Sequence, residues 1–431
     1  MNVAFTTLGC KVNTYESAAL EAMFQDAGFS VVDAKDVADV YIINTCTVTN
    51  AADAKSRKAI RRAVRQNPEA VVGVIGCYSQ LESEAVAAIE GVDIIMGTSE
   101  RGRLLDNVNR FLREREPLKE VKDFAALRAF DQLNVSSFSD NTRAFLKIQD
   151  GCNQYCSFCI IPYARGPVRS RPMDDVLDEA KRLISAGYQE IVLTGIHTGG
   201  YGQDLDETRF YDLLKAMTAL EGLVRLRISS IEINQLSDDI LDLIATNKVF
   251  ARHLHIPIQS GSDGVLRRMR RRYSVSAFSD RLKAVRTRLP DVAITTDVIV
   301  GFPGETEDEF LETKATLERL AFSELHVFPY SKRSGTKAAA FSNHVHGTVK
   351  TLRAGELGAL NEMLAKRFAQ ARLDDVHDVL FERCDGSMCE GHTSHYLRVR
   401  VETDKHLENT VCRVKLTKPD YPQSLATFVE K

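Results

Sequence analysis

The stretch GCNQYCSFC, residues 151–159, sets three cysteines at the spacing C-x3-C-x2-C. It follows RAFLKIQ (143–149), an apolar run that predicts a buried strand. Three thiolates that hold an iron–sulfur cluster leave one iron with an open position, where a substrate or cofactor binds directly. The spacing alone also leaves open a zinc site with a fourth ligand, although no histidine follows before His197, and a chance grouping.

The region behind this stretch alternates apolar runs with helix-like segments. The runs are RAFLKIQ, EIVLTG (190–195), LVRLRISS (223–230), RHLHIPI (252–258), VAITTDVIVG (292–301) and ELHVFPY (324–330). Six βα units in one series predict a partial or complete (β/α) barrel. One helix is expected over 345–372, and the short β-rich runs beyond it predict a small all-β module.

The first part of the chain shows a second βα rhythm. Its apolar runs are VAFTTL (3–8), VYIINT (40–45), VVGVIG (71–76) and VDIIM (92–96), with helical segments between them. This order predicts a doubly wound parallel sheet. We therefore expect an N-terminal domain at 1–115, a linker at 116–142, a barrel with its trailing helix at 143–372 and a β module at 373–431.

Three further cysteines share a position relative to these strands. Cys10, Cys46 and Cys77 each come directly after an expected strand. Ligands of open parallel sheets bind at the carboxyl ends of strands, so the three thiols are expected to converge on one point. A second three-cysteine iron–sulfur site is the interpretation we favour, and three buried core cysteines are the alternative.

Composition narrows the class of protein. The net charge is -3, so any nucleic-acid surface must be local, and the apolar stretches are too short to span a bilayer. The N-terminus lacks the pattern of a signal peptide, which predicts a cytoplasmic protein that does not enter a membrane. Nine cysteines in such a chain favour metal ligands, catalytic groups or free thiols over a disulfide framework.

The cysteine spacing, the aromatic Phe158 and the position after the first strand of the series resemble the radical S-adenosylmethionine superfamily. The resemblance implies that S-adenosylmethionine binds the open iron and is cleaved to a deoxyadenosyl radical, while the protein positions the cofactor. It also implies cofactor-binding roles in the loops after the strands, for Phe158, Thr194, Gly195, Ser229, Glu232, Gln259, Ile299 and Gly301.

The whole chain resembles the methylthiotransferases, radical enzymes with an N-terminal methylthiotransferase domain and a C-terminal TRAM module. The matching motifs are TLGCKVNTYES, INTCTVTNAAD, VIGCYSQ, IQDGCNQYCSFCIIPYARG, IPIQSGSDGVLRRMRRRY and DVIVGFPGETEDEF. The family implies two four-iron four-sulfur clusters as metal centres. The catalytic cysteines Cys152, Cys156 and Cys159 hold the radical cluster, and Cys10, Cys46 and Cys77 hold an auxiliary cluster that carries the sulfur.

Three branches of this family differ around the first cysteine. LGCKVNTYES is similar to the MtaB type, which methylthiolates carbon 2 of N6-threonylcarbamoyladenosine at position 37, beside the anticodon of transfer RNA. The alternatives are the branch that acts on isopentenyladenosine in transfer RNA, with GCQMN, and the branch that acts on a ribosomal-protein aspartate, with LGCPKN. The implied partners are transfer RNA, an external electron donor and a sulfur source. A rival from another class is a non-catalytic iron–sulfur RNA-binding protein or redox sensor.

Two basic runs are candidates for RNA contact. VLRRMRRRY carries five arginines between Arg267 and Arg272, and KSRKAIRRAVR carries six cations at helical spacing. A solvated helix face is the alternative for both. In the tail, His392, Tyr396, Arg398 and Arg400 are further candidates, and a zinc site at Cys384, Cys389, Cys412, His392 and His395 is conceivable but disfavoured.

Overall fold

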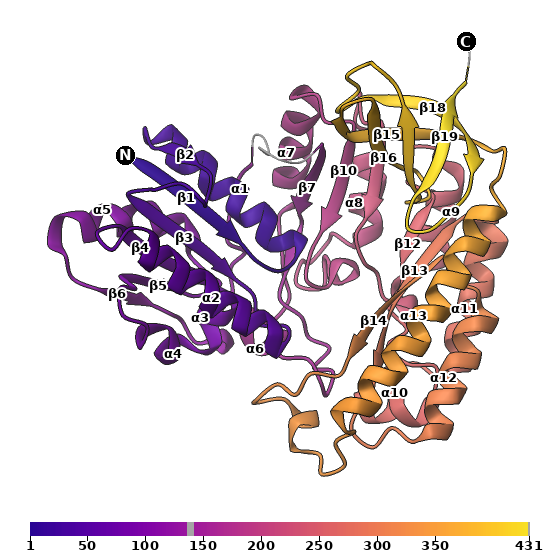
Figure 1. The fold of residues 1–431 in the computed structure, drawn as a ribbon, viewed down its shortest axis with the longest axis horizontal. Helices are drawn as coiled ribbons and strands as arrows, with labels where there is room; N and C mark the ends of the chain where they lie inside the picture. Colours follow the sequence, from indigo (N-terminus) through magenta and orange to yellow (C-terminus); the bar gives the residue numbers. More distant parts are fainter. Residues whose placement is uncertain (136–141, 430–431) are drawn as a thin grey trace.

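The computed structural model describes residues 1–135 and 142–429. Its N-terminal part is a six-stranded parallel sheet in the order β2-β1-β3-β4-β5-β6 (Figure 1). The strands are β1 (Asn2–Thr7), β2 (Ser30–Val32), β3 (Val40–Thr45), β4 (Val71–Gly76), β5 (Ile94–Met96) and β6 (Leu118–Glu120). The helices are α1 (Lys11–Asp26), α2 (Asn50–Gln66), α3 (Cys77–Leu81), α4 (Ser83–Ala87) and α5 (Leu104–Glu114), with 3₁₀ turns η1 (Arg101–Arg103) and η2 (Phe124–Ala126).

Helices cover both faces of this sheet, as the alternation of runs predicts. Tyr15 of α1 and Val108 of α5 pack with Val40 on one face. Ile60 of α2 packs with Tyr41 on the other face. Because side chains alternate along each strand, neighbouring residues of β3 enter different cores, and both faces of the sheet are buried.

The central part is a partial barrel of six parallel strands. One sheet has the order β11-β10-β7 and a second has the order β12-β13-β14, and a parallel bridge from Leu226 to Phe250 joins the β11 side to the segment before β12. The strands are β7 (Arg143–Lys147), β10 (Glu190–Thr194), β11 (Arg225–Ile228), β12 (His253–His255), β13 (Ala293–Val300) and β14 (Glu324–Pro329). A small antiparallel pair, β8 (Gln149–Asp150) and β9 (Arg169–Ser170), flanks the first cysteine loop.

Helices line the outside of the partial barrel. They are α6 (Ile161–Arg165), α7 (Met173–Ser185), α8 (Phe210–Thr218), α9 (Asp238–Thr246), α10 (Asp263–Met269), α11 (Val275–Arg288), α12 (Glu307–Leu320) and α13 (Gly347–Gln370), with 3₁₀ turns η3 (Thr198–Gly200), η4 (Ile233–Gln235) and η5 (Lys337–Ala340). Helix α13 falls inside the range 345–372 expected from the sequence, and it packs beside β14 and α12 (Figure 1).

The C-terminal module is a closed five-stranded barrel in the order β15-β16-β17-β19-β18. Its strands are β15 (Val376–Asp385), β16 (Met388–Thr393), β17 (Arg398–Glu402), β18 (Val411–Lys418) and β19 (Ser424–Phe428). Val379, Phe381 and Leu416 belong to its buried core. In Figure 1 the module lies against the central barrel, next to β10 and β12. The α/β class, the parallel sheet, the barrel and the small β module are therefore confirmed.

The structure corrects one boundary. Leu118–Glu120, inside the expected linker 116–142, is strand β6 and pairs in parallel with β5. The sequence of this three-residue strand contains no apolar run, so the expected N-terminal domain ended at residue 115, before β6. Residues 136–141 of the same expected linker lie outside the described residues. Within the described parts of the chain, no helix is long and apolar enough to cross a membrane.

Candidate active site

The first cysteine triplet lies in the loop between β8 and α6. Backbone hydrogen bonds shape the loop: the amide of Cys159 donates to the carbonyl of Cys156 (3.0 Å) and the amide of Cys152 donates to the carbonyl of Gly166 (3.0 Å). Gly151 has φ +73°, and a Cβ there would lie 1.9 Å from the carbonyl oxygen of Pro167. Only glycine fits that backbone position, which turns the chain into the loop.

The three thiols of this loop lie close enough to influence one another. Burial, together with the charge of Cys156, raises the pKa of Cys152 to about 11 and that of Cys159 to about 12. Arg271 Nη1 donates to Cys156 Sγ (3.3 Å), and the Gln154 amide faces Cys152 Sγ (3.5 Å). Three mutually repelling thiolates in a partly buried loop fit a polynuclear iron site, which supplies the positive charge they need.

The second triplet lies at the carboxyl edge of the N-terminal sheet. Cys10 caps the start of α1 after β1, Cys46 follows β3, and Cys77 opens α3 directly after β4. Gly9 between β1 and Cys10 has φ +108°, and a Cβ there would lie 3.1 Å from Cys46 Sγ. The three strand ends therefore bring their thiols to one place, as expected for the carboxyl ends of parallel strands in one sheet.

The chemistry of this second set also fits a cluster. Burial raises the pKa of Cys46 and raises that of Cys77 to about 11, and the charge of Cys10 raises both. Arg165 opposes this effect, because its Nε donates to Cys77 Sγ at 3.1 Å. A cationic group directed at a buried sulfur, with two more thiols beside it, is suited to holding thiolates that carry iron.

A buried ionic network joins the two triplets. Arg165 of α6 also donates to Glu16 of α1 (2.6 Å) and to Asp150 of β8 (3.1 Å). Lys147 of β7 bridges the same two carboxylates at 2.8 Å and 2.7 Å. Arg101 forms an ion pair with Glu16 from the N-terminal side. These side chains are fully buried, so the network fixes the N-terminal sheet against the barrel.

One cavity of about 910 Å³ opens onto both triplets. Cys10 lines it from the N-terminal domain, and Cys152 and Cys159 line it from the barrel loop. The cavity runs along the inner side of the barrel strands to the C-terminal module, where Tyr396 and Arg398 close its wall. Thiols of both triplets therefore face one common space.

Three of the expected cofactor-binding residues line this cavity. They are Thr194, Gly195 and Ser229, at the carboxyl ends of β10 and β11. The hydroxyl of Ser229 lies 3.2 Å from that of Thr198, and the hydroxyl of Thr194 donates to the carbonyl of Val192 (3.1 Å). The Thr194 hydroxyl therefore bonds within its own strand, whereas the Ser229 hydroxyl contacts the side chain of Thr198.

The other expected cofactor-binding residues lie away from the cavity wall. Phe158 and Ile299 pack against a small hydrophobic cluster around Phe302. The amide of Gly301 donates to Glu305 Oε2 (2.6 Å). Gln259 pairs by its backbone with the β13 strand, since its amide donates to the carbonyl of Asp297 (2.9 Å).

Glu232 forms an ion pair with Arg271, which also contacts Cys156. Arg271 therefore belongs to the site rather than to an RNA surface. Arg268 of the same basic run binds Glu309 of α12 (2.6 Å) on the barrel. Arg267, Arg270 and Arg272 are exposed and stay candidates for RNA contact, whereas Arg268 and Arg271 are each paired with a carboxylate.

The second basic run forms an exposed face of α2. Lys55, Lys58, Arg61, Arg62 and Arg65 are exposed, and within the described part of the chain none of them forms an ion pair. Arg57 instead donates to the Tyr78 hydroxyl (3.1 Å). Unneutralised cations on one helix face are suited to binding a phosphate backbone.

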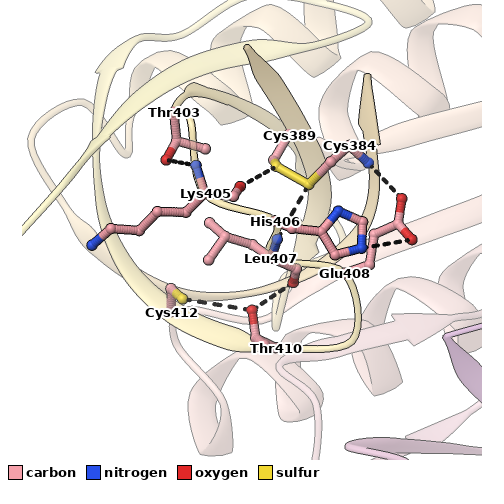
Figure 2. The surroundings of a disulfide bond; sticks show 9 residues. All are labelled: Cys384, Cys389, Thr403, Lys405, His406, Leu407, Glu408, Thr410 and Cys412. Atoms are coloured by element: carbon pink, nitrogen blue, oxygen red, sulfur yellow. Dashed lines mark hydrogen bonds and ion pairs between the residues drawn. A yellow bond between two sulfur atoms is a disulfide. The ribbon is translucent and has the colours of Figure 1, made fainter. Parts of the chain in front are cut away.

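The cysteines of the tail do not form the conceivable zinc site. Cys384 and Cys389 are joined by a disulfide on the β15–β16 hairpin, and Cys412 lies beside Thr410 (Figure 2). His392 is committed to Glu382 (2.8 Å) and His395 faces Asp291 (3.4 Å), so neither histidine is directed at these sulfurs. The local β pairing brings the two cysteines opposite each other, which the sequence spacing does not reveal.

Several polar residues at the site were not predicted from the sequence. Arg165 stands in the quoted motif IIPYARG, and Arg271 stands in the basic run, so both had a sequence signal that pointed elsewhere. His197 has no such signal, because its position depends on Gln149, which accepts from its amide (2.8 Å). Burial, together with the charge of Arg271, lowers the pKa of His197 to about 4.

Two family models match the chain. The model described as "Uncharacterized protein family UPF0004" matches residues 2–97, and the model described as "Radical SAM superfamily" matches residues 146–317. The first match spans the strand-end cysteines, and the second spans the cysteine loop and the strands whose ends line the cavity.

Curated relatives match nearly the full length. The chain is 47% identical to "Threonylcarbamoyladenosine tRNA methylthiotransferase MtaB" of Bacillus subtilis, over 99% of this chain and 96% of the relative. It is 37% identical to the protein of the same name of Aquifex aeolicus, over 85% and 90%. It is 32% identical to "tRNA-2-methylthio-N(6)-dimethylallyladenosine synthase" of Carboxydothermus hydrogenoformans, over 95% of each chain.

A solved structure with a similar fold is the radical S-adenosylmethionine methyltransferase TsrM of Kitasatospora setae, with cobalamin and a [4Fe-4S] cluster bound. It has a TM-score of 0.58 at 15% identity and covers 78% of this chain and 77% of that one. At that identity the likeness concerns the fold alone.

Proposed function

We propose that this chain, which belongs to the threonylcarbamoyladenosine tRNA methylthiotransferase family of radical S-adenosylmethionine enzymes, inserts a methylthio group at carbon 2 of N6-threonylcarbamoyladenosine in transfer RNA. The higher identity to the relatives with this name than to the dimethylallyladenosine synthase supports this branch over the isopentenyl alternative. The cofactors of this proposal are two [4Fe-4S] clusters, one for each cysteine triplet, and S-adenosylmethionine, in keeping with the radical S-adenosylmethionine match.

The single observation that carries the proposal is the shared cavity. Cys10 of one triplet lines the same cavity as Cys152 and Cys159 of the other. A sulfur insertion needs radical generation and a sulfur source at one carbon atom, and two separated cavities would not allow it. The buried network of Glu16, Arg165 and their partners keeps this spacing fixed.

The residues of the chain have separate roles in this proposal. Cys152, Cys156 and Cys159 would hold one cluster, and Cys10, Cys46 and Cys77 the other. When bound, the clusters supply the electron that cleaves S-adenosylmethionine and the sulfur that is transferred.

Two arginines tune these sites. Arg271 donates to Cys156 and Arg165 donates to Cys77, so each stabilises thiolate charge at one triplet. Ser229 and the backbone at Gly195 offer polar contacts for the cofactor at the cavity wall.

The partners follow from this chemistry. The exposed cations of α2 are proposed to contact the phosphate backbone of the transfer RNA. An external electron donor and a sulfur source must serve the clusters, and their identity is open to biochemical assay. A cytoplasmic location remains our prediction, as the place where such a protein meets its RNA substrate.

The test is anaerobic reconstitution with reductant, S-adenosylmethionine and anticodon hairpins. One hairpin carries threonylcarbamoyladenosine and a second carries isopentenyladenosine, and the products are digested to nucleosides for mass spectrometry. We expect the methylthio derivative from the first hairpin only. Product from the isopentenyl hairpin alone would move the chain to the other branch. Production of neither derivative, with no 5′-deoxyadenosine, would support the rival of a non-catalytic iron–sulfur protein.

A further inference from the structure

The cavity contains a lysine without a partner. Lys11 follows Cys10 directly and lines the cavity. Within residues 1–135 and 142–429 its ammonium group forms no hydrogen bond and no ion pair. Lys11 is partly buried, so the protein places a cation in the wall of its cavity without an anion to compensate it.

The surroundings of this lysine carry surplus positive charge. Its charged neighbours are Arg143, Arg227 and Glu190. Glu190 is already occupied, because it binds Arg227 Nε at 2.6 Å and Arg225 Nη1 at 3.1 Å. Arg143 binds a different carboxylate, Glu382, at 3.1 Å. Four cations thus share two carboxylates, an arrangement that favours an anionic ligand.

An aromatic wall stands beside the lysine. The ring of Tyr396 stacks on His253 at 4.8 Å between ring centroids, and the guanidinium of Arg227 lies 4.8 Å from its centre. The Tyr396 hydroxyl accepts from Arg143 Nη1 (3.2 Å). Although burial favours the protonated phenol, the nearby cations lower its pKa below the ordinary value, which again indicates a positive potential at this end of the cavity.

The carboxylates that line the cavity elsewhere have contacts of their own. Asp297 lies 3.3 Å from His255 Nε2, and Glu324 accepts from the hydroxyl of Tyr421 (3.4 Å). His326 stands next to His255, with 5.5 Å between the ring centroids, and burial lowers its pKa. A neutral imidazole at this wall offers one donor and one acceptor to a hydroxyl or carbamoyl group.

We infer that Lys11 binds the carboxylate of the threonylcarbamoyl side chain and makes the enzyme selective for a charged, rather than an apolar, substituent at N6. Lys11 is adjacent to Cys10 and lines the same cavity as the thiols, so the N6 substituent of a purine bound beside the thiols would lie within reach of this cavity wall. Tyr396 and His326 line the pocket that the side chain would enter. This inference rests on the proposed function and assigns one determinant of its specificity.

A phosphate of the RNA backbone has the same anionic chemistry, so the experiment must separate the two. Two hairpins are compared that differ in one group: threonylcarbamoyladenosine with a free carboxylate, and the same nucleoside with a neutral carboxamide. The proteins are the reconstituted wild type, Lys11→Met, Lys11→Arg and Lys215→Met, which removes an exposed lysine of α8 as a matched control. The readouts are kcat/KM, the Kd of each hairpin and iron content.

We expect the wild type to prefer the carboxylate hairpin by roughly 10- to 100-fold, the range of a hydrogen bond to a charged group. Lys11→Met should lose this preference, and its kcat/KM for the carboxamide hairpin should stay within about threefold of the wild-type value. Lys11→Arg and Lys215→Met should keep the preference. Equal iron content in all four proteins separates lost recognition from lost folding.

Three outcomes would overturn the inference. If the wild type does not distinguish the two hairpins, the inference is refuted whatever the variants show. Equal weakening of both hairpins by Lys11→Met would assign the lysine to an RNA phosphate instead. A preference that survives in Lys11→Met would place the carboxylate elsewhere. A wild type that modifies only the isopentenyl hairpin would refute the proposed function itself, which is a distinguishable result.

Discussion

Replacing Glu16 by glutamine tests whether the buried ionic network fixes the two cysteine triplets in one cavity. Glu16 receives Arg165 at 2.6 Å and Lys147 at 2.8 Å, and it also pairs with Arg101. The Glu16→Gln change keeps the size of the side chain and removes its charge. Three buried cations then depend chiefly on Asp150 and Asp131 for compensation.

The magnitude follows from two independent arguments. Burial opposes ionisation of Glu16, but Arg101, Arg165 and Lys147 outweigh it and lower its pKa from 4.5 to about 2. That difference corresponds to about 3 kcal/mol of folding free energy. Removing one partner of a buried pair costs about 3–5 kcal/mol in other proteins. We therefore expect Glu16→Gln to lower the free energy of unfolding by about 3 kcal/mol.

The assay is urea unfolding followed by circular dichroism, with Glu362→Gln as the control because Glu362 forms an exposed pair with Lys366. A carboxylate with a lowered folded pKa stabilises the protein above its unfolded value and loses that contribution as the pH falls toward the folded value. The difference between wild type and Glu16→Gln should therefore be constant from pH 8 to pH 5 and narrow below about pH 4.5. A difference below 1 kcal/mol at pH 7.5 would refute the structural role of the network.

Three further predictions concern other parts of the molecule. Arg271→Gln should slow 5′-deoxyadenosine formation at least tenfold, measured by chromatography, because the thiolate of Cys156 loses its charged donor; an unchanged rate would remove Arg271 from the site. Reversing Lys58 and Arg62 to glutamate should weaken transfer-RNA binding and reduce the log–log salt slope by roughly 0.7–0.9 per lost contact; an unchanged slope would make α2 a solvated face. Cys384→Ser should leave iron content and sulfur insertion unchanged, because its disulfide lies in the C-terminal barrel outside the cavity lining; lost iron would contradict this.

The fold was predictable where long apolar runs mark buried parallel strands. VYIINT and VVGVIG became β3 and β4, fully buried on both faces. The order of the two βα series also predicted the barrel, because parallel strands need helical crossovers. Strand β6 was missed because a three-residue edge strand needs few apolar residues, and its pairing with β5 depends on tertiary contact.

The site was predictable only where backbone topology decides the position. The carboxyl edge of a parallel sheet brings Cys10, Cys46 and Cys77 together whatever their side-chain environment, so their juxtaposition could be expected. Ion-pair partners follow no such rule. Arg271 meets Glu232 from a distant segment, and a basic run by itself suggests solvent.

The cofactor-binding residues that the family resemblance implied fall into two groups for the same reason. Thr194 is the last residue of β10 and Ser229 follows β11, and both line the cavity. Phe158 and Ile299 instead pack against the hydrophobic cluster around Phe302 and are not part of the cavity lining. Their role as cofactor contacts remains a prediction.

The most direct test of two clusters serving one cavity is the variant Cys10→Ala/Cys46→Ala/Cys77→Ala, reconstituted anaerobically and assayed for iron, 5′-deoxyadenosine and methylthio product. Iron should fall from about eight to about four atoms per chain, as expected when one of two cubane clusters is lost. The variant should still cleave S-adenosylmethionine, because the loop of Cys152 belongs to the barrel, and it should insert no sulfur. Full iron content together with methylthiolated RNA would contradict the account, since the strand-end cysteines would then be core residues and the sulfur would come from elsewhere.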